Sequence, residues 1–267
     1  MTIIALMFLS FSCLPALATG EDGVRVTENI KKITLQAVTD DLQSKDEYYG
    51  YVKGTIPILI SAPHGAKHFR TREQRWKAED AYTSQLAILL GRKTGAYVIF
   101  LKKEATEDPN NDLQSRYKDF LGKVVKENGI RFIIDLHGAC ASAPFKVDVG
   151  TITNSIAKCS CPTFRPLIAE AFQNFDTEVF NQRFRARGNG TITYFAKHNL
   201  GIEAAQFEIN AHFRILKSKA KDDLQGSEQN VADLLGRFQE MIMAINNKIT
   251  GDLRVSSAMI SMLSGLP

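Results

Sequence analysis

The amino-acid sequence predicts an α/β protein in which a central mixed, largely parallel sheet is flanked by helices. Short apolar runs rich in β-branched and aromatic residues alternate along the chain with segments whose apolar residues recur at helical spacing. Alternating strands and helices are typical of layered α/β folds. Two of the apolar runs, which begin at Ile56 and at Phe132, end abruptly in a His-Gly pair. Continuous apolar strands of this kind indicate burial on both faces of a sheet.

The first half of the chain predicts strands and helices in turn. Residues 48–54 predict a hairpin-like lead into the strand that begins at Ile56. A helix is expected over about residues 77–90, because apolar residues recur there at helical spacing and a glycine follows as a stop. Residues 95–101 predict another strand, and residues 117–129 a second helix that ends at a glycine. The strand at Phe132 then completes this half.

The second half continues the alternation. Residues 147–153 predict a strand, and residues 165–175 a helix with one apolar face. A short helix is expected at residues 191–198, ahead of a glycine stop, and a last strand at residues 204–210. Residues 231–249 form a strongly amphipathic pattern that predicts the closing helix.

Composition and charge limit the classes of function. With 267 residues, 44% of them hydrophobic and 23% charged, the chain has the composition of an ordinary globular protein. We expect a single domain over residues 19–267, since no low-complexity linker or repeat interrupts the chain. The formal net charge is +4, and the basic residues are scattered among acidic ones. This distribution argues against a nucleic-acid partner.

Residues 1–18 predict a secretory signal peptide. They carry no charged side chain, include an apolar run, and end in the small-x-small pattern Ala16-Leu17-Ala18. We therefore expect an exported protein, secreted or periplasmic. An uncleaved anchor or a mispredicted start is the alternative, because the segment lacks the usual Lys or Arg. No later apolar run approaches the ~20 residues that a membrane span requires.

Three cysteines follow the predicted signal peptide. In an oxidising compartment Cys140 could pair with Cys159 or Cys161 and leave one thiol over. A Cys-Ser-Cys metal site at residues 159–161 is the alternative, although no second Cys/His pair has suitable spacing.

The two histidines that end apolar strands predict a metal centre. If the strands are parallel, His64 and His137 emerge beyond their carboxyl ends, where open α/β sheets bind ligands. A zinc hydrolase needs three protein ligands and one open position for water. We expect Asp80 as the third ligand; Glu79 is the alternative, because the two would lie about 100° apart on a helix. Asp135 lies two residues before His137 and could orient its imidazole.

Other catalytic chemistries are poorly supported. His68 becomes an alternative metal ligand only if residues 64–68 form a helix, and the glycine after His64 disfavours that. The sequence has no Gly-x-Ser-x-Gly elbow and no phosphate-binding loop. A cysteine nucleophile would have to be Cys140, which lies only three residues beyond His137.

Taken together, four segments resemble the N-formylglutamate amidohydrolase family, zinc-dependent relatives of the carboxypeptidase and aspartoacylase hydrolases. The segments are Ser61–Gly65, Glu79–Ala87, Asp135–Gly138, and Phe207–Asn210 with Arg214 nearby. The resemblance implies a phosphorylase/hydrolase-like α/β fold and a Zn²⁺ cofactor. It places His64, Asp80 and His137 on the metal positions and Glu208 on the catalytic carboxylate.

The resemblance also implies a binding site for a substrate carboxylate. Arg187 and Asn189, in a glycine-punctuated loop, are the main candidates, and Arg116 is a further one. An arginine offers a planar fork of donors that suits a carboxylate. The alternative for residues 183–187 is a solvated basic loop. For Glu208, whose predicted task is to take a proton from the attacking water, the alternative is a salt bridge to Arg214.

We therefore expect a zinc-dependent amidohydrolase that cleaves an N-acyl, N-formylglutamate-like amide. Its substrate would be a small N-acyl amino acid or a short peptide that bears a carboxylate. An exported zinc carboxypeptidase or cell-wall amidase is the second hypothesis. A non-catalytic binding domain that keeps the fold is the third.

Overall fold

The computed structural model describes residues 48–176, 178–215 and 227–264. The predicted signal peptide, residues 1–18, lies outside the described residues. The strands are β1 (Tyr49–Val52), β2 (Ile58–Ala62), β3 (His68–Arg70), β4 (Arg75–Lys77), β5 (Tyr97–Leu101), β6 (Phe132–Ala139), β7 (Val147–Gly150) and β8 (Glu203–Asn210). The helices are α2 (Thr83–Thr94), α3 (Arg116–Asn128), α4 (Arg165–Ala171), α5 (Ile192–Phe195) and α6 (Glu228–Ser264), with short helical turns η1 (Ile156–Lys158), η2 (Ala196–Leu200) and η3 (Ala211–Phe213).

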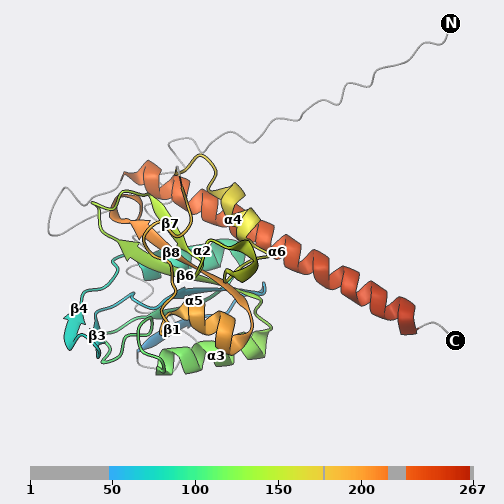
Figure 1. Cartoon of the computed structure of the whole chain (residues 1–267), viewed down its shortest axis with the longest axis horizontal. Helices are drawn as coiled ribbons and strands as arrows, with labels where there is room; N and C mark the ends of the chain where they lie inside the picture. The colour runs from blue at the N-terminus through green and yellow to red at the C-terminus, as the bar shows by residue number, and fades with distance from the viewer. Residues whose placement is uncertain (1–47, 177, 216–226, 265–267) are drawn as a thin grey trace, which may run out of the picture.

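A six-stranded sheet forms the centre of the molecule, in the order β1-β5-β2-β6-β8-β7 (Figure 1). The four inner strands run parallel to one another, and the edge strands β1 and β7 pair antiparallel with β5 and β8. The predicted mixed, largely parallel sheet is therefore confirmed. A separate two-stranded sheet is formed by β3 and β4.

Helices cover both faces of the sheet, as the alternation of strands and helices predicts. In β2, Ile58 and Ile60 share one buried cluster with α2, α4 and α6. The intervening Leu59 lies in a second cluster with α3 and α5 on the opposite face. Because successive side chains of a strand point to opposite faces, an uninterrupted apolar run is what a strand between two helical layers requires.

The central strands bring the two predicted histidines together. In the parallel β2–β6 pair, Ile58 lies opposite Phe132 and Ser61 opposite Asp135. His137 lies near the end of β6, and His64 follows β2 by two residues. Both therefore emerge at the carboxyl edge of the sheet. On the other side of β6, the register of β8 places Glu208 directly opposite His137.

The helix expected over residues 77–90 begins later than predicted, so Glu79 and Asp80 precede it instead of lying in its first turn. The helix α2 starts at Thr83, after Tyr82 in the left-handed region with φ 68°. The backbone N–H of Asp80 donates to the carbonyl of His64 at 2.8 Å, and Thr83 donates to the carbonyl of Asp80. These contacts hold the segment against the His64 turn, and such tertiary contacts override local helix propensity.

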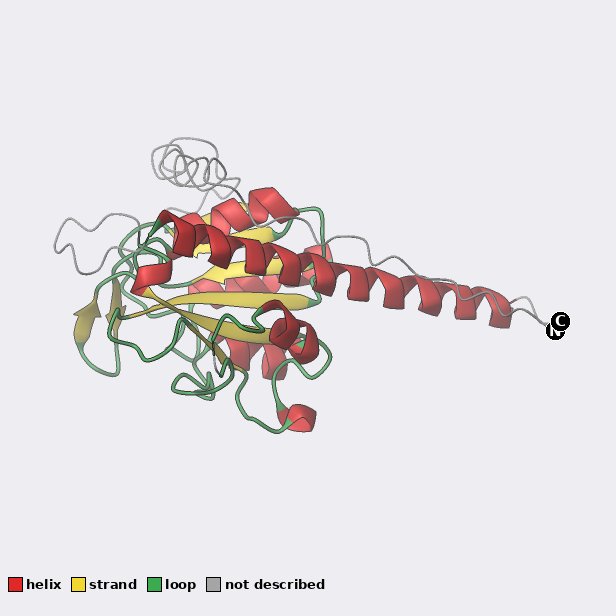
Figure 2. Ribbon diagram, turned by 90° about the horizontal axis from the view of Figure 1, so that it is seen from above, coloured by secondary structure: helices red, strands yellow, loops and turns green. Residues whose placement is uncertain are grey.

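Two further predictions of secondary structure differ from the structure. Residues 48–54 do not form a hairpin with β2; β1 instead pairs with β5 at the edge of the sheet. The closing helix α6 was expected over residues 231–249 but runs to Ser264, and its C-terminal part extends beyond the layers (Figure 2). Among the side chains of this helix that the structure describes, which reach residue 255, the last buried apolar one is Ile249. The amphipathic pattern thus predicted the packed part of the helix.

None of the described helices is long and apolar enough to cross a bilayer. The three cysteines that the structure describes carry free thiols, Cys140 exposed and Cys159 and Cys161 buried, so Cys140 is not paired with either of the other two.

Candidate metal centre

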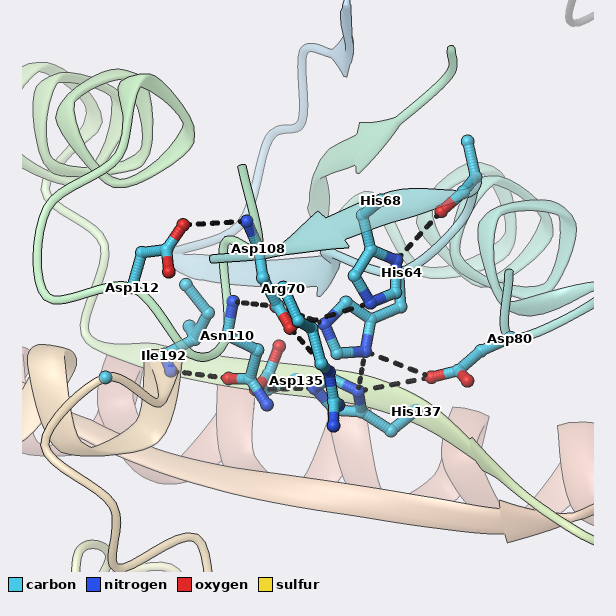
Figure 3. A network of polar contacts seen from close by, with 12 residues as sticks. His64, His68, Arg70, Asp80, Asp108, Asn110, Asp112, Asp135, His137 and Ile192 are labelled. Atoms are coloured by element: carbon cyan, nitrogen blue, oxygen red, sulfur yellow. Dashed lines mark hydrogen bonds and ion pairs between the residues drawn. The ribbon is translucent and has the colours of Figure 1, made fainter. Parts of the chain in front are cut away.

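Three side chains meet at the carboxyl edge of the sheet (Figure 3). They are His137 from β6, His64 from the turn after β2 and Asp80 from the loop before α2. The Nδ1 atoms of His64 and His137 are 3.2 Å apart. Oδ2 of Asp80 lies 3.4 Å from Nδ1 of His64 and 3.3 Å from Nδ1 of His137. The three atoms thus form a nearly equilateral triangle. Asp80, rather than Glu79, supplies the carboxylate.

The size of this triangle fits a tetrahedral zinc ion. Zinc bonds to nitrogen and oxygen ligands of about 2.0–2.2 Å, so the ligand atoms of a tetrahedral site lie roughly 3.3–3.5 Å apart. The edges of 3.2–3.4 Å in this triangle match that spacing. Two histidines and one carboxylate would leave a fourth position open, as in catalytic zinc sites.

The outer nitrogens of both histidines face carboxylates. Nε2 of His64 lies 2.7 Å from Oδ1 of Asp108, and Nε2 of His137 lies 3.1 Å from Oδ2 of Asp135. A carboxylate fixes the proton of neutral imidazole on the nitrogen that it contacts. Each Nδ1 is then left with its lone pair toward the triangle. The orienting contact predicted for Asp135 is present.

The charges of the cluster also suit a cation. Burial lowers the pKa of His64, but hydrogen bonds to Asp108 and Asp80 outweigh it and raise the pKa. Burial lowers the pKa of His137 as well, but the charge of Asp135 and its hydrogen bond outweigh burial and raise this pKa well above the usual value. Burial would raise the pKa of Asp80, and hydrogen bonds to the two histidines instead hold it well below its usual value. The site thus attracts protons, and a divalent cation can replace them.

Asp108 and Arg70 were not predicted as site residues. Asp108 is fully buried and accepts from Arg70 Nε at 2.9 Å through the oxygen that does not contact His64. Burial would raise the pKa of Asp108, but His64 and its other cationic neighbours hold it far below the usual range. His64 and Arg70 therefore keep Asp108 ionised, and one carboxylate oxygen contacts each of them. The only sequence signal was the turn Asp108-Pro109-Asn110.

His68 stacks on His64 and does not join the triangle. The two rings are 4.0 Å apart and nearly parallel, and Nδ1 of His68 lies 3.1 Å from the carbonyl of Ala66. Burial and the neighbouring His64 lower the pKa of His68 to about 4. His64, His68 and Asp108 form a second group of potential ligands. In that group the 2.7 Å separation of His64 and Asp108 is a hydrogen bond, shorter than the ligand spacing around zinc.

Glu208 lies beside the triangle and lines the same cavity. It is 7% exposed, and Oε1 accepts a hydrogen bond from Gln206 Nε2 at 2.9 Å. Burial raises the pKa of Glu208 to about 7, although the neighbouring His137 acts in the opposite direction. Among the described ion pairs there is none between Glu208 and Arg214. The guanidinium of Arg214 instead donates to the backbone carbonyls of Ala81, Ala139 and Ile209.

A directed chain of hydrogen bonds ends on Glu208. The backbone N–H of Ile192 can only donate, and it donates to Oδ1 of Asn110 at 2.7 Å. The amide nitrogen of Asn110 therefore donates to Oε1 of Gln206 at 3.3 Å, which leaves the amide nitrogen of Gln206 to donate to Glu208. Glu208 is thus held by one oxygen, and its second oxygen is free to face the cavity.

The cavity in front of these residues has a volume of about 670 Å³. Its wall includes Arg187, which was predicted to bind a substrate carboxylate. Asn189 is exposed and is not among the described residues that line it. Arg116 lies at the start of α3, with its guanidinium over the rings of Tyr48 and Tyr49 and away from the cavity wall. Binding roles for Asn189 and Arg116 stay predictions.

Comparison with known proteins identifies the fold. No protein-family model and no curated protein matches the sequence. Among solved structures, N-formylglutamate amidohydrolase from Ralstonia eutropha aligns with a TM-score of 0.56 and 12% identity, over 78% of this chain and 100% of the other. This chain has the N-formylglutamate amidohydrolase fold. A gene product from Agrobacterium tumefaciens aligns with a TM-score of 0.51 and 11% identity, over 76% of this chain and 97% of that one.

The predicted fold class is therefore confirmed. At such low identity the likeness concerns the fold alone.

Proposed function

We propose that this protein is a metal-dependent amidohydrolase that cleaves the N-acyl amide of a small, carboxylate-bearing substrate, with zinc as its metal. One observation carries the proposal: a triangle of ligand atoms of tetrahedral size lies beside a buried glutamate in a cavity with an arginine in its wall. The fold shared with N-formylglutamate amidohydrolase supports it.

His64, Asp80 and His137 would hold the cation. When bound, a zinc ion supplies Lewis acidity, which polarises a carbonyl and makes water acidic enough to attack at neutral pH. Asp108 and Asp135 contribute by fixing both imidazoles with Nδ1 toward the site. Arg214 holds the Asp80 loop against the ends of β6 and β8 through its three carbonyl contacts.

Glu208 is the proton carrier in this proposal. Its free oxygen takes a proton from the attacking water and later gives it to the leaving amine, so the same carboxyl serves as base and then as acid. A pKa of about 7 suits both tasks near neutral pH. The hydrogen bond from Gln206 restricts the carboxyl group to one orientation.

Arg187 would bind the substrate carboxylate. Its side chain is exposed at the cavity wall, where a guanidinium can form two parallel hydrogen bonds to a carboxylate. This contact fixes which end of the substrate faces the metal ligands and places the amide carbon near Glu208.

A substrate panel tests the proposal. Formylated, acetylated and succinylated amino acids and short peptides are offered to the purified protein, with and without removal of metal by a chelator. We expect hydrolysis of N-acyl amino acids that stops on metal removal and returns with zinc. Preference for the peptides would favour an exported carboxypeptidase or cell-wall amidase, and binding without turnover would favour a non-catalytic domain. Export of the protein stays part of the proposal.

A further inference from the structure

The cavity wall carries more positive charge than one carboxylate requires. Besides Arg187, it includes Arg183, Arg185 and Lys77. In the part of the chain that the structure describes, none of these four side chains forms an ion pair with an acidic group. By contrast, Arg70 is neutralised by Asp108 and Glu73. Unpaired cations gathered at a cavity are expected where the ligand supplies the negative charge.

The three arginines lie on a segment that is fixed in place. The carboxylate of Asp148 accepts hydrogen bonds from the backbone N–H groups of residues 182, 183 and 184 at 3.0, 2.7 and 2.7 Å. Asp148 is fully buried, and the N–H of Ile152 donates to the carbonyl of Arg185 at 2.7 Å. The backbone of the segment is thus bound to β7 and the residues that follow it, while its arginine side chains remain exposed.

Asp148, which holds this segment in place, lies beside Glu208, the candidate catalytic residue. In the antiparallel pair of β7 and β8, Asp148 lies directly opposite Glu208. Directly opposed residues of an antiparallel pair project to the same face of the sheet. The backbone of residues 182–184 is therefore held on the face of the sheet that carries Glu208.

We propose that the substrate is an oligo-anionic acidic peptide, whose successive carboxylates contact Arg183 and Arg185 in addition to the carboxylate that binds Arg187. This inference rests on the proposed function and extends it from a single N-acyl amino acid to a longer chain. A peptide suits the site better than a nucleic acid, because Phe184 is the only aromatic ring in the described cavity wall apart from the candidate metal ligands His64 and His137. Single-stranded nucleic acids are bound largely by stacking on aromatic rings.

The test compares N-formylglutamate with N-formyl-triglutamate, and N-formyl-triglutamine, whose side chains are uncharged, serves as the match. For the wild-type protein we expect kcat/KM to be roughly 10-fold higher for the triglutamate than for the single residue, and the advantage should shrink as salt is added. Arg183→Gln and Arg185→Gln should each reduce this ratio by about 3-fold. An equal gain with triglutamine would overturn the proposal.

Arg72→Gln is the matched control. Arg72 is exposed in the turn between β3 and β4, outside the cavity wall, so the substitution removes the same charge without removing a contact to the peptide. The ratio of the two kcat/KM values should be unchanged in this variant. If Arg72→Gln lowers it as much as Arg185→Gln, only the net charge matters and the proposed contacts are refuted.

Binding separates this inference from the proposed function. Triglutamate is titrated into Glu208→Gln protein by calorimetry, with and without Arg185→Gln, and a short single-stranded DNA serves as a second polyanion. If the wild type hydrolyses none of the substrates, but triglutamate still binds and its binding depends on Arg185, the inference of an acidic-peptide ligand stands and the proposed hydrolase function fails. If the wild type hydrolyses N-formylglutamate but shows no advantage for triglutamate, the proposed function stands and the inference of an acidic-peptide ligand fails. Equal, Arg185-dependent binding of the DNA would overturn the assignment to peptides.

Discussion

Replacing Glu208 with Gln should change how the stability of the metal-free protein depends on pH. Burial gives Glu208 a pKa of about 7 in the folded state, against 4.5 for an unperturbed glutamate. Because the folded-state value is the higher one, the contribution of this group to stability is fully present below pH 4.5 and is lost as the pH rises through 7. The gap between the two values corresponds to roughly 3 kcal/mol.

Urea unfolding between pH 4.5 and pH 8.5, after chelation of metal, measures this effect. The free energy of unfolding of the wild type, minus that of Glu208→Gln, should fall by roughly 3 kcal/mol across the range. The comparison cancels the titration of the histidines, which both proteins share. Parallel curves for the two proteins would show that Glu208 is not buried in the folded state as described, and the argument for its role as a base at neutral pH would fail.

Three other variants test the parts of the site separately. Asp108→Asn should weaken zinc binding by roughly 10- to 100-fold in competition with a chromophoric chelator, because His64 loses the carboxylate that orients it; unchanged affinity would mean that Asp108 does not orient His64. Arg187→Lys should mainly raise KM for substrates with a free carboxylate, since lysine cannot form the paired contact; an equal loss on amidated substrates would refute that role. Gln206→Leu should lower kcat by about 10-fold with zinc content unchanged, since Glu208 loses its orienting donor; a wild-type kcat would show that the hydrogen-bond chain is not needed.

The sheet and the two histidines were predictable because their signals are local. An apolar run that ends in His-Gly identifies a buried strand and the residue at its carboxyl end, and β2 and β6 confirm both positions. The choice of Asp80 required the fold. Asp80 precedes α2 because its backbone is hydrogen-bonded to His64, a contact that the helical periodicity of residues 77–90 does not reveal.

The contacts that orient the metal ligands and Glu208 could not be predicted, because they join distant parts of the chain. Asp108 lies 44 residues from His64, and the amide of Asn110 reaches Gln206 across 96 residues. No spacing rule links such positions. Arg70 belongs to the β3–β4 hairpin, which the sequence pattern did not indicate, so its pairing with Asp108 was missed as well.

Titration of the metal-free protein with zinc tests whether His64, Asp80 and His137 hold a catalytic metal ion. Elemental analysis and the rate of hydrolysis of an N-acyl amino acid are followed together as zinc is added. We predict that activity rises in proportion to bound zinc, reaches its maximum at one ion per chain, and that His137→Ala loses most of the metal and the activity together. Full activity in protein without bound metal, or a His137→Ala variant that keeps both, would contradict the assignment of His64, Asp80 and His137 as the metal ligands.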